Sequence, residues 1–281
     1  MGESPTARRR HVGAELRRLR EAARISREQV AELLECSISK VTKIELGDVA
    51  IKRKELDALL DTYGAPADGR SDLLAVAREA KKRDWYSSLG APGWFRKFLG
   101  LESSATEIKT FEAELIPGVI QTEDYVRAVI EAVSPELPAG DLERRMQVRS
   151  ERQAQLFGQD PPRFTAIFSE AAIRRVVGGP KVMSAQLKFL VEAQSEPHIE
   201  LQVLPFRAGA HAAIGFTFIL LQFASDDVPS VAYLEDLTSA AYLDKSVHLQ
   251  TYRLAFDRLR GAALGPADSA VLIKQAIGEL E

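Results

Sequence analysis

The sequence predicts an all-α N-terminal domain of five short helices, followed by an α/β or α+β C-terminal domain with one mixed sheet and flanking helices. Over residues 8–83, apolar side chains recur at spacings of three and four, the period of helices that bury one face. Farther along, short runs alternate apolar and polar residues between helical patterns, which indicates strands interleaved with helices. We therefore expect one domain over residues 8–83 and a second over residues 88–281, with the boundary at 83–88.

The N-terminal helices carry recognisable start and end signals. Ser26 and Ser37 are good N-caps, and Gly47 and Gly64 suit left-handed ends. Residues 1–7 are expected to be a frayed tail. Besides the helix that follows Ser26, we expect helices at about residues 8–23, 38–46, 52–63 and 69–83.

The second domain is expected to contain one sheet of about four or five strands. The aromatic residues between Trp85 and Phe98 favour an inter-domain core. The expected strands are 108–115, 164–168, 199–204, 216–223 and 231–234. The expected helices begin at Glu123 and Pro180 or span 141–157, 246–264 and 266–280.

Composition narrows the class of protein. A hydrophobic share of 46% and a charged share of 27% are those of a soluble globular protein, and neither a membrane span nor a signal peptide is expected. The single Cys36 rules out a disulfide framework, and the four histidines lack metal-ligand spacing. We expect a cytoplasmic, nucleoid-associated protein that is not an enzyme and has no metal or cofactor. An acid/base site would require His211, Glu235 and Glu170 to converge.

The stretch from Ser26 to Gly47 predicts a helix-turn-helix, because two short helical runs are joined by a turn at residues 34–37. The second helix would enter the major groove of double-stranded DNA. Lysine can donate to guanine, serine and threonine can serve several bases, and isoleucine can pack on a thymine methyl. The expected base-reading residues are Ile38, Ser39, Thr42 and Lys43. The expected phosphate-binding residues are Arg17, Arg27, Lys40 and Lys52.

Residues 13–63 resemble the XRE/lambda-repressor-type helix-turn-helix family. The resemblance is carried by Leu16-Arg17-Arg18-Leu19-Arg20, Ser26-Arg27-Glu28-Gln29-Val30-Ala31, Ser37-Ile38-Ser39-Lys40-Val41-Thr42-Lys43-Ile44-Glu45 and Gly47. It implies that Arg20 pairs with Glu45, which would fix the first helix to the third. The family usually has glycine where Glu35 stands, so we expect a left-handed residue there at a cost of about 1 kcal/mol.

The second domain resembles a domain of unknown function that follows such helix-turn-helix units in regulators of filamentous actinobacteria. The matching residues include Ile116-Pro117-Gly118, Glu143-Arg144-Arg145, Val203-Leu204-Pro205-Phe206, Gly209-Ala210-His211 and Tyr233-Leu234-Glu235. The resemblance implies a transcription factor encoded beside a small partner protein, and an antitoxin-like member of such a pair in some cases. It also implies links to development and antibiotic production.

Two groups of residues are candidates for control. Arg145, Arg149 and Arg152 share one helix face, which is either a docking stripe for a small acidic partner or a solvated face with glutamate pairs. His211 and Glu235 are candidates for an effector pocket. The resulting hypothesis is a homodimeric DNA-binding regulator on a palindromic operator, controlled by a small partner protein. The alternative is a repressor that senses a small molecule through its C-terminal domain.

Overall fold

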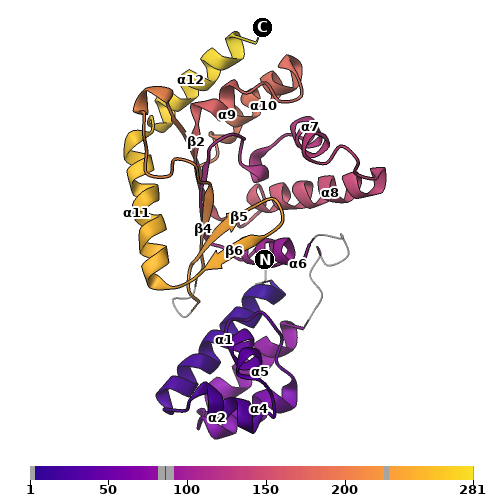
Figure 1. Cartoon of the computed structure of the whole chain (residues 1–281), viewed down its shortest axis with the longest axis vertical. Helices are drawn as coiled ribbons and strands as arrows, with labels where there is room; N and C mark the ends of the chain where they lie inside the picture. Colours follow the sequence, from indigo (N-terminus) through magenta and orange to yellow (C-terminus); the bar gives the residue numbers. More distant parts are fainter. Residues whose placement is uncertain (1–3, 82–85, 87–91, 225–227, 281) are drawn as a thin grey trace. The chain divides into compact units, whose positions relative to one another are not determined.

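The computed structural model describes residues 4–81, 86, 92–224 and 228–280. The chain forms two compact units, drawn in Figure 1. The first comprises Met1–Ser87, Arg96–Ser104 and Phe223–Pro229, and the second comprises Ser88–Phe95, Ala105–Gln222 and Ser230–Glu281. The expected boundary at 83–88 and the aromatic Trp85 lie outside the described residues, except for Tyr86.

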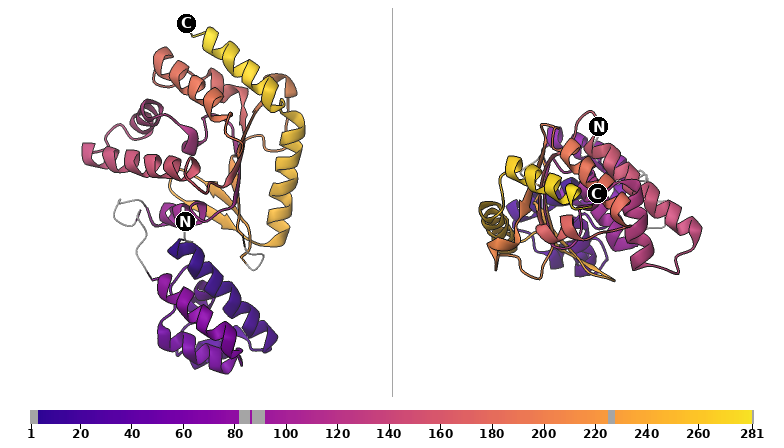
Figure 2. Two further views of the ribbon diagram at one scale, coloured as in Figure 1. Left: turned by 180° about the vertical axis from the view of Figure 1, so that it is seen from behind. Right: turned by 90° about the horizontal axis from the view of Figure 1, so that it is seen from above.

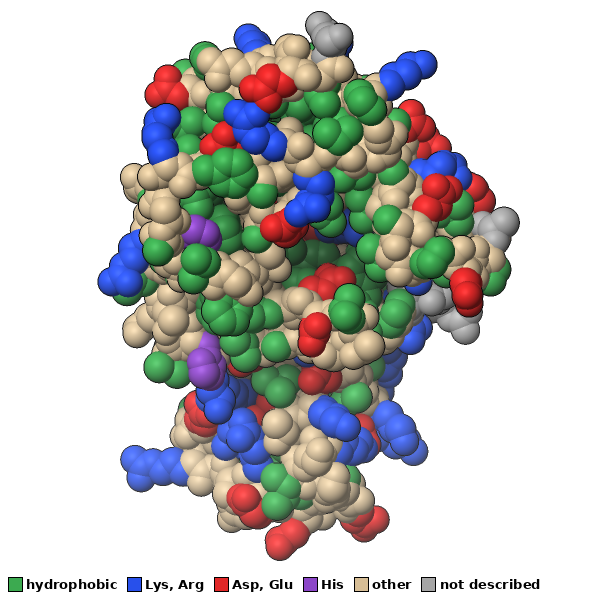
Figure 3. All heavy atoms as spheres, turned by 45° about the horizontal axis from the view of Figure 1, so that its top comes forward, with side chains coloured by type: hydrophobic (Ala, Val, Ile, Leu, Met, Phe, Trp, Pro, Cys, Tyr) green, Lys and Arg blue, Asp and Glu red, His purple; other side chains and the backbone are tan. Residues whose placement is uncertain are grey.

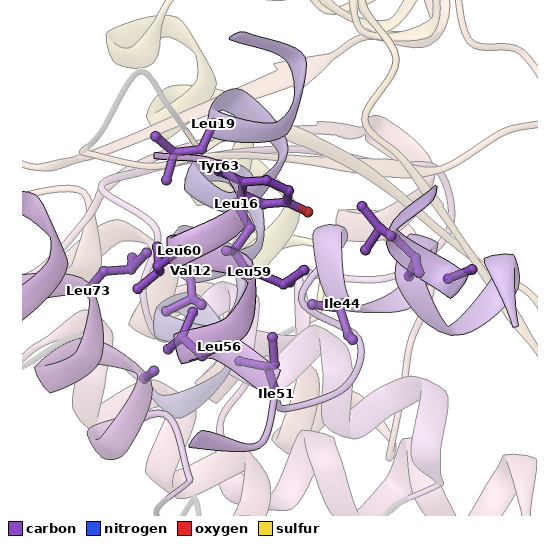
Figure 4. Packing of buried hydrophobic residues seen from close by; sticks show 14 residues of the cluster. Val12, Leu16, Leu19, Ile44, Ile51, Leu56, Leu59, Leu60, Tyr63 and Leu73 are labelled. Carbon is purple, nitrogen blue, oxygen red and sulfur yellow. The ribbon is translucent and has the colours of Figure 1, made fainter. Parts of the chain in front are cut away.

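The first unit begins with five helices, as the apolar periodicity predicted. They are α1 (Pro5–Ala22), α2 (Arg27–Leu33), α3 (Ile38–Glu45), α4 (Arg53–Thr62) and α5 (Ala67–Glu79). Their inward faces form one hydrophobic core, shown in Figure 4. Leu16, Leu56 and Leu60 are each 1% exposed at its centre, and Tyr63 packs at its side. Burial of this apolar stripe holds the helices together, and α2, α3 and α4 are too short to be stable alone.

The expected frayed tail is wrong for residues 4–7. Helix α1 starts at Pro5, and the Ser4 side chain caps it by accepting a hydrogen bond from the Ala7 amide. Thr6 and Ala7 are buried, at 5% and 6% exposure. The Thr6 hydroxyl lies 3.1 Å from the Tyr86 hydroxyl, and a side chain at Gly100 would collide with Thr6. These packing partners come from distant parts of the sequence, which explains why the local pattern did not predict the order of this segment.

The second unit contains a six-stranded mixed sheet in the order β3-β2-β1-β4-β5-β6. Strands β1, β2 and β3 are parallel, and β4, β5 and β6 continue the sheet by antiparallel pairing. The strands are β1 (Glu107–Glu112), β2 (Arg163–Ser169), β3 (Ile199–Leu204), β4 (Phe218–Gln222), β5 (Val231–Glu235) and β6 (Ala240–Leu243). Five of these lie within two residues of predicted starts, whereas β6 was not predicted.

Helices cover both faces of the sheet. In the rear view of Figure 2, α11 (Ser246–Ala262) lies on one side of the sheet, with α7 (Glu123–Val133), α8 (Ala139–Leu156) and α10 (Pro180–Ala193) on the other. On the face toward α11, Phe111 of β1 and Phe218 of β4 form one buried cluster with Phe256 of α11. The remaining helices are α6 (Gly93–Glu102), α9 (Glu170–Arg174) and α12 (Pro266–Gly278), with short 3₁₀ turns η2 (Gly118–Ile120) and η3 (Phe206–Ala208). The mixed sheet with flanking helices confirms the predicted fold class.

Candidate nucleic-acid interface

Two serine caps and a left-handed turn form the α2–α3 unit. Ser26 accepts from the Gln29 amide, and the Gln29 side chain accepts in return from the Ser26 amide. Ser37 caps α3 by accepting from the amide of Lys40 at 3.2 Å. Between the helices, Glu35 has φ +47°, so the expected left-handed residue is confirmed. The turn can therefore set the direction in which α3 leaves α2.

Glu45, the last residue of α3, holds two arginines. Its Oε1 lies 2.5 Å from Arg20 Nε, and its Oε2 lies 2.8 Å from Arg27 Nε. The Glu45 side chain is only 4% exposed and that of Arg20 only 9%. Burial opposes the charge of Arg20, but the hydrogen bond and charge of Glu45 keep the pKa of Arg20 above its ordinary value. The structure thus brings Arg20 and Glu45 together and joins α1, α2 and α3 at one buried carboxylate.

The four expected base readers lie on α3 with different freedom to bind. Ile38 is 45% exposed, and Ser39 and Lys43 are exposed too. Within the described part of the chain, Lys43 makes no ion pair or side-chain hydrogen bond, so its ammonium group is available to a ligand. The Thr42 hydroxyl donates to the Ile38 carbonyl at 3.1 Å, which leaves its lone pairs as acceptors.

Three of the four expected phosphate binders already have acidic partners. Arg17 pairs with Glu21 at 2.9 Å, and Lys40 Nζ lies 2.7 Å from Glu55 Oε1. Arg27 uses its Nε on Glu45, while its two terminal nitrogens have no bond to any described residue. Lys52 is exposed and has no ion pair among the described residues. Phosphate binding by these four side chains stays a prediction.

Glu55 joins α3 to α4. It accepts from Lys40 Nζ and, through its other oxygen, from the Lys52 amide at 3.1 Å. Burial would raise the pKa of Glu55, but the hydrogen bonds from Lys40 and Lys52 bring it below its ordinary value. Helix α3 is thus fixed by Glu45 at one end and by Lys40 nearer the other. This arrangement presents a rigid helix face.

On the face drawn in Figure 3, lysines and arginines are interspersed with aspartates and glutamates, so charge alone marks no interface on that face. The assignment to nucleic acid therefore rests on the geometry of α2 and α3 and on the exposed side chains of α3.

The expected arginine stripe of α8 is not one surface. Arg145 is exposed and donates to the Ser134 hydroxyl at 3.2 Å. Arg152 is 5% exposed, and its guanidinium lies 5.9 Å from the centre of the Phe95 ring. The Arg149 guanidinium lies so close to Gly118 that a side chain there would collide with it. Docking of an acidic partner stays a prediction for Arg145, whereas the burial of Arg152 corrects the expectation of one exposed stripe.

The three residues considered for an acid/base site have separate partners. His211 stacks edge-on against Phe111 with ring centroids 5.4 Å apart, and burial lowers its pKa. Glu235 accepts from the Tyr233 hydroxyl at 2.7 Å. Glu170 accepts from the Phe206 amide and from Arg174. Within the described residues, none of the three is hydrogen-bonded to another.

Glu112, at the end of β1, is a functional candidate that the sequence did not indicate. It is half-buried, and its Oε1 accepts a long hydrogen bond of 3.4 Å from Thr110. Among the described residues it has no ion pair within 4 Å. Burial raises the pKa of Glu112 to about 7, and Glu235 contributes in the same direction against the opposing charge of Arg149.

This pKa predicts a pH-dependent stability of the second unit. Because the folded-state pKa of about 7 lies above the ordinary 4.5, the folded chain holds this proton more tightly than the unfolded chain. The contribution of Glu112 to the free energy of unfolding is therefore greatest below pH 4.5 and falls as the pH rises through 7. Urea unfolding of Glu112→Gln at pH 5, 6, 7 and 8 should lack this decline. The control Glu192→Gln should retain it, and identical pH profiles for both variants would contradict the assignment.

No helix among the described residues is long and apolar enough to span a membrane. Nor do the described residues contain a cluster of three or more histidine, cysteine, aspartate or glutamate side chains suited to a metal ion.

Two family models match separate parts of the chain. A model of a helix-turn-helix domain matches residues 11–73, which indicates a DNA-binding regulator. A second model, described as Domain of unknown function (DUF5753), matches residues 95–275. Since that match covers more than half of the sequence, the chain belongs to the DUF5753 family. No similar protein was found among the curated proteins or among the solved structures.

Proposed function

We propose that this protein is a sequence-specific transcriptional regulator that reads one DNA half-site with α3. The supporting observation is the exposed face of α3 on a helix whose two ends are fixed by Glu45 and by the Lys40–Glu55 pair. A rigid helix in the major groove can read base edges, whereas phosphate contacts provide position and much of the affinity. The XRE-type resemblance of residues 13–63 supports the same assignment.

A single unit of this size makes few base contacts, so we propose a homodimer on a palindromic operator. The half-sites would then be separated by one or more turns of DNA. A footprint with two protected segments related by a dyad, together with a dimer mass on DNA, is the expected result. One protected segment and a monomer mass would contradict it.

Control is proposed to act through the second unit, by a small partner protein encoded nearby, in an actinobacterial and antitoxin-like system. This proposal rests on the resemblance of the second domain and needs no catalytic chemistry. The alternative is a small-molecule effector, which is favoured by the half-buried Glu112 near Glu235. Either input changes DNA binding only if it binds one state of the regulator better than the other. We further propose that the protein works in the cytoplasm, at the nucleoid.

Substitution of Lys43 by alanine tests the DNA-reading role directly. We expect the binding free energy for the preferred DNA site to weaken by about 1–3 kcal/mol and the preference at one base position to relax, because alanine cannot make the hydrogen bonds that Lys43 would make to a base. Selection from a random DNA pool followed by binding titrations at fixed salt measures both effects. Lys181→Ala, on the exposed face of α10, is the matched control. An unchanged base preference in Lys43→Ala would contradict the proposed reading face.

In the same assay, Arg27→Ala tests whether Arg27 contributes to overall affinity through a phosphate contact and not to base preference. If the terminal nitrogens of Arg27 bind phosphate, the variant should bind all sequences more weakly and show a smaller salt dependence. A changed base preference with an unchanged salt slope would count against phosphate binding.

A further inference from the structure

The C-terminal end of α3 lies directly against the backbone of α1. Gly47, which follows α3, has φ +72°, and a β-carbon there would lie 2.6 Å from the Cα of Arg10. Only glycine allows this approach, since any side chain would meet backbone atoms that cannot rotate away. Arg10 is therefore the residue of α1 against which the end of α3 is placed.

The side chain of Arg10 contacts a different part of the sequence. It is 7% exposed, donates from Nη2 to the Pro229 carbonyl at 3.0 Å, and lies 5.4 Å from the centre of the Phe223 ring. Phe223 is itself only 9% exposed. Phe223–Pro229 belongs to the first unit, yet it is the direct connection between β4 and β5. Arg10 therefore contacts both the β4–β5 connection and the C-terminal end of α3.

A second connection reaches the same place. Asp48 continues the last turn of α3, because its amide donates to the Lys43 carbonyl at 2.8 Å. Lys97 Nζ of α6 lies 2.6 Å from Asp48 Oδ1. The residues Arg96–Ser104 also belong to the first unit, and they lead within a few residues into β1 at Glu107.

We propose that Arg10 and Lys97 are positioning residues that hold the C-terminal end of α3 against Phe223–Pro229 and Arg96–Ser104, and that these two contacts set the DNA affinity of α3. The DNA part of this inference rests on the proposed function. The base-reading Lys43 lies within the last turn of α3, so a small displacement of this end moves the side chain that would meet a base.

Amide hydrogen exchange in the full chain tests the tie independently of DNA. In Arg10→Gln and in Lys97→Gln, exchange at the Asp48 amide should become about tenfold faster, since opening of this end would need less free energy. The Cys36 amide, which donates to the Ala31 carbonyl across the α2–α3 turn, should keep its exchange rate.

Two further variants serve as comparisons. In Arg10→Lys the Asp48 amide should exchange at an intermediate rate, because the lysine keeps a cation over the Phe223 ring. Arg260→Gln, which removes an exposed pair with Glu200, is the control. Unchanged exchange at Asp48, or equal acceleration at Asp48 and Cys36, would overturn the proposal.

A charge exchange then tests the consequence for DNA. Lys97→Asp and Asp48→Lys should each bind the selected site about fivefold more weakly, and the double variant should recover most of the loss. If all three bind like the wild type, the link to DNA affinity is wrong. If the wild-type protein binds no DNA, the proposed function fails, while the exchange experiment still decides whether the tie exists.

Discussion

Replacement of Glu45 by alanine is expected to destabilise the N-terminal unit by about 3–5 kcal/mol, because it leaves the buried guanidinium of Arg20 without its counter-charge. The side chains of Glu45 and Arg20 are 4% and 9% exposed, so water cannot replace the lost carboxylate at low cost. The same change also removes the ion pair between Glu45 and Arg27 of α2. Helices α1 and α2 therefore both lose their charged contact with α3.

Chemical unfolding followed by circular dichroism measures this loss. Glu32→Ala, at an exposed position of α2, should change stability by less than about 0.5 kcal/mol and serves as the control. Arg20→Met combined with Glu45→Leu should recover part of the loss, because apolar replacement of both partners removes the uncompensated charge. A loss in Glu45→Ala no larger than that of Glu32→Ala would show that the pair is not a structural centre.

Gly13→Ala is expected to cost about 3 kcal/mol, at the upper end of the usual range for overpacking, and to reduce DNA binding. A β-carbon at Gly13 would lie 2.6 Å from the Glu45 carbonyl oxygen and would also collide with the Ile44 carbonyl oxygen. Both obstacles are backbone atoms, so α1 and α3 must separate to admit the methyl group. The displacement would move α3 itself.

Gly69→Ala is a suitable control, because a β-carbon at that helical position meets nothing within 4 Å. It should be neutral or slightly stabilising, since alanine is the better helix former. Melting temperatures and DNA titrations of the two variants give the comparison. Equal stability of Gly13→Ala and the wild type would show that the α1–α3 crossing is looser than the structure indicates.

The sequence predicted the five N-terminal helices and five of the six strands because periodicity and caps are local properties. Ser26 and Ser37, for example, mark the starts of α2 and α3 by chemistry within three residues. Strand β6 was not predicted, since Ala240–Leu243 is short and its residues are only partly buried. Helix α6 was not predicted, since glycine and proline lie at and just before its start at Gly93.

The site residues divide in a similar way. The turn conformation of Glu35 followed from the family resemblance, whereas the bond of Arg27 to Glu45 depends on contact across 18 positions that no local pattern reports. In the expected strand 108–115, Glu112 alternates with apolar residues, a pattern typical of a half-buried strand. Helices cover both faces of this sheet, so alternation could not reveal that Glu112 lies in a partly enclosed position with a raised pKa.

The first unit is interrupted in sequence, because it takes Arg96–Ser104 and Phe223–Pro229 from parts of the chain that frame the sheet. An evolutionary exchange of domains at a single crossover near residue 85 would join a helix-turn-helix to segments that had not evolved against its α1. New pairings between such units should therefore require compensating changes at Arg10 and Phe223. We expect the helix-turn-helix unit and the sheet-containing unit of such proteins to be inherited together. Proteins that share this sheet should therefore carry only a limited range of helix-turn-helix units.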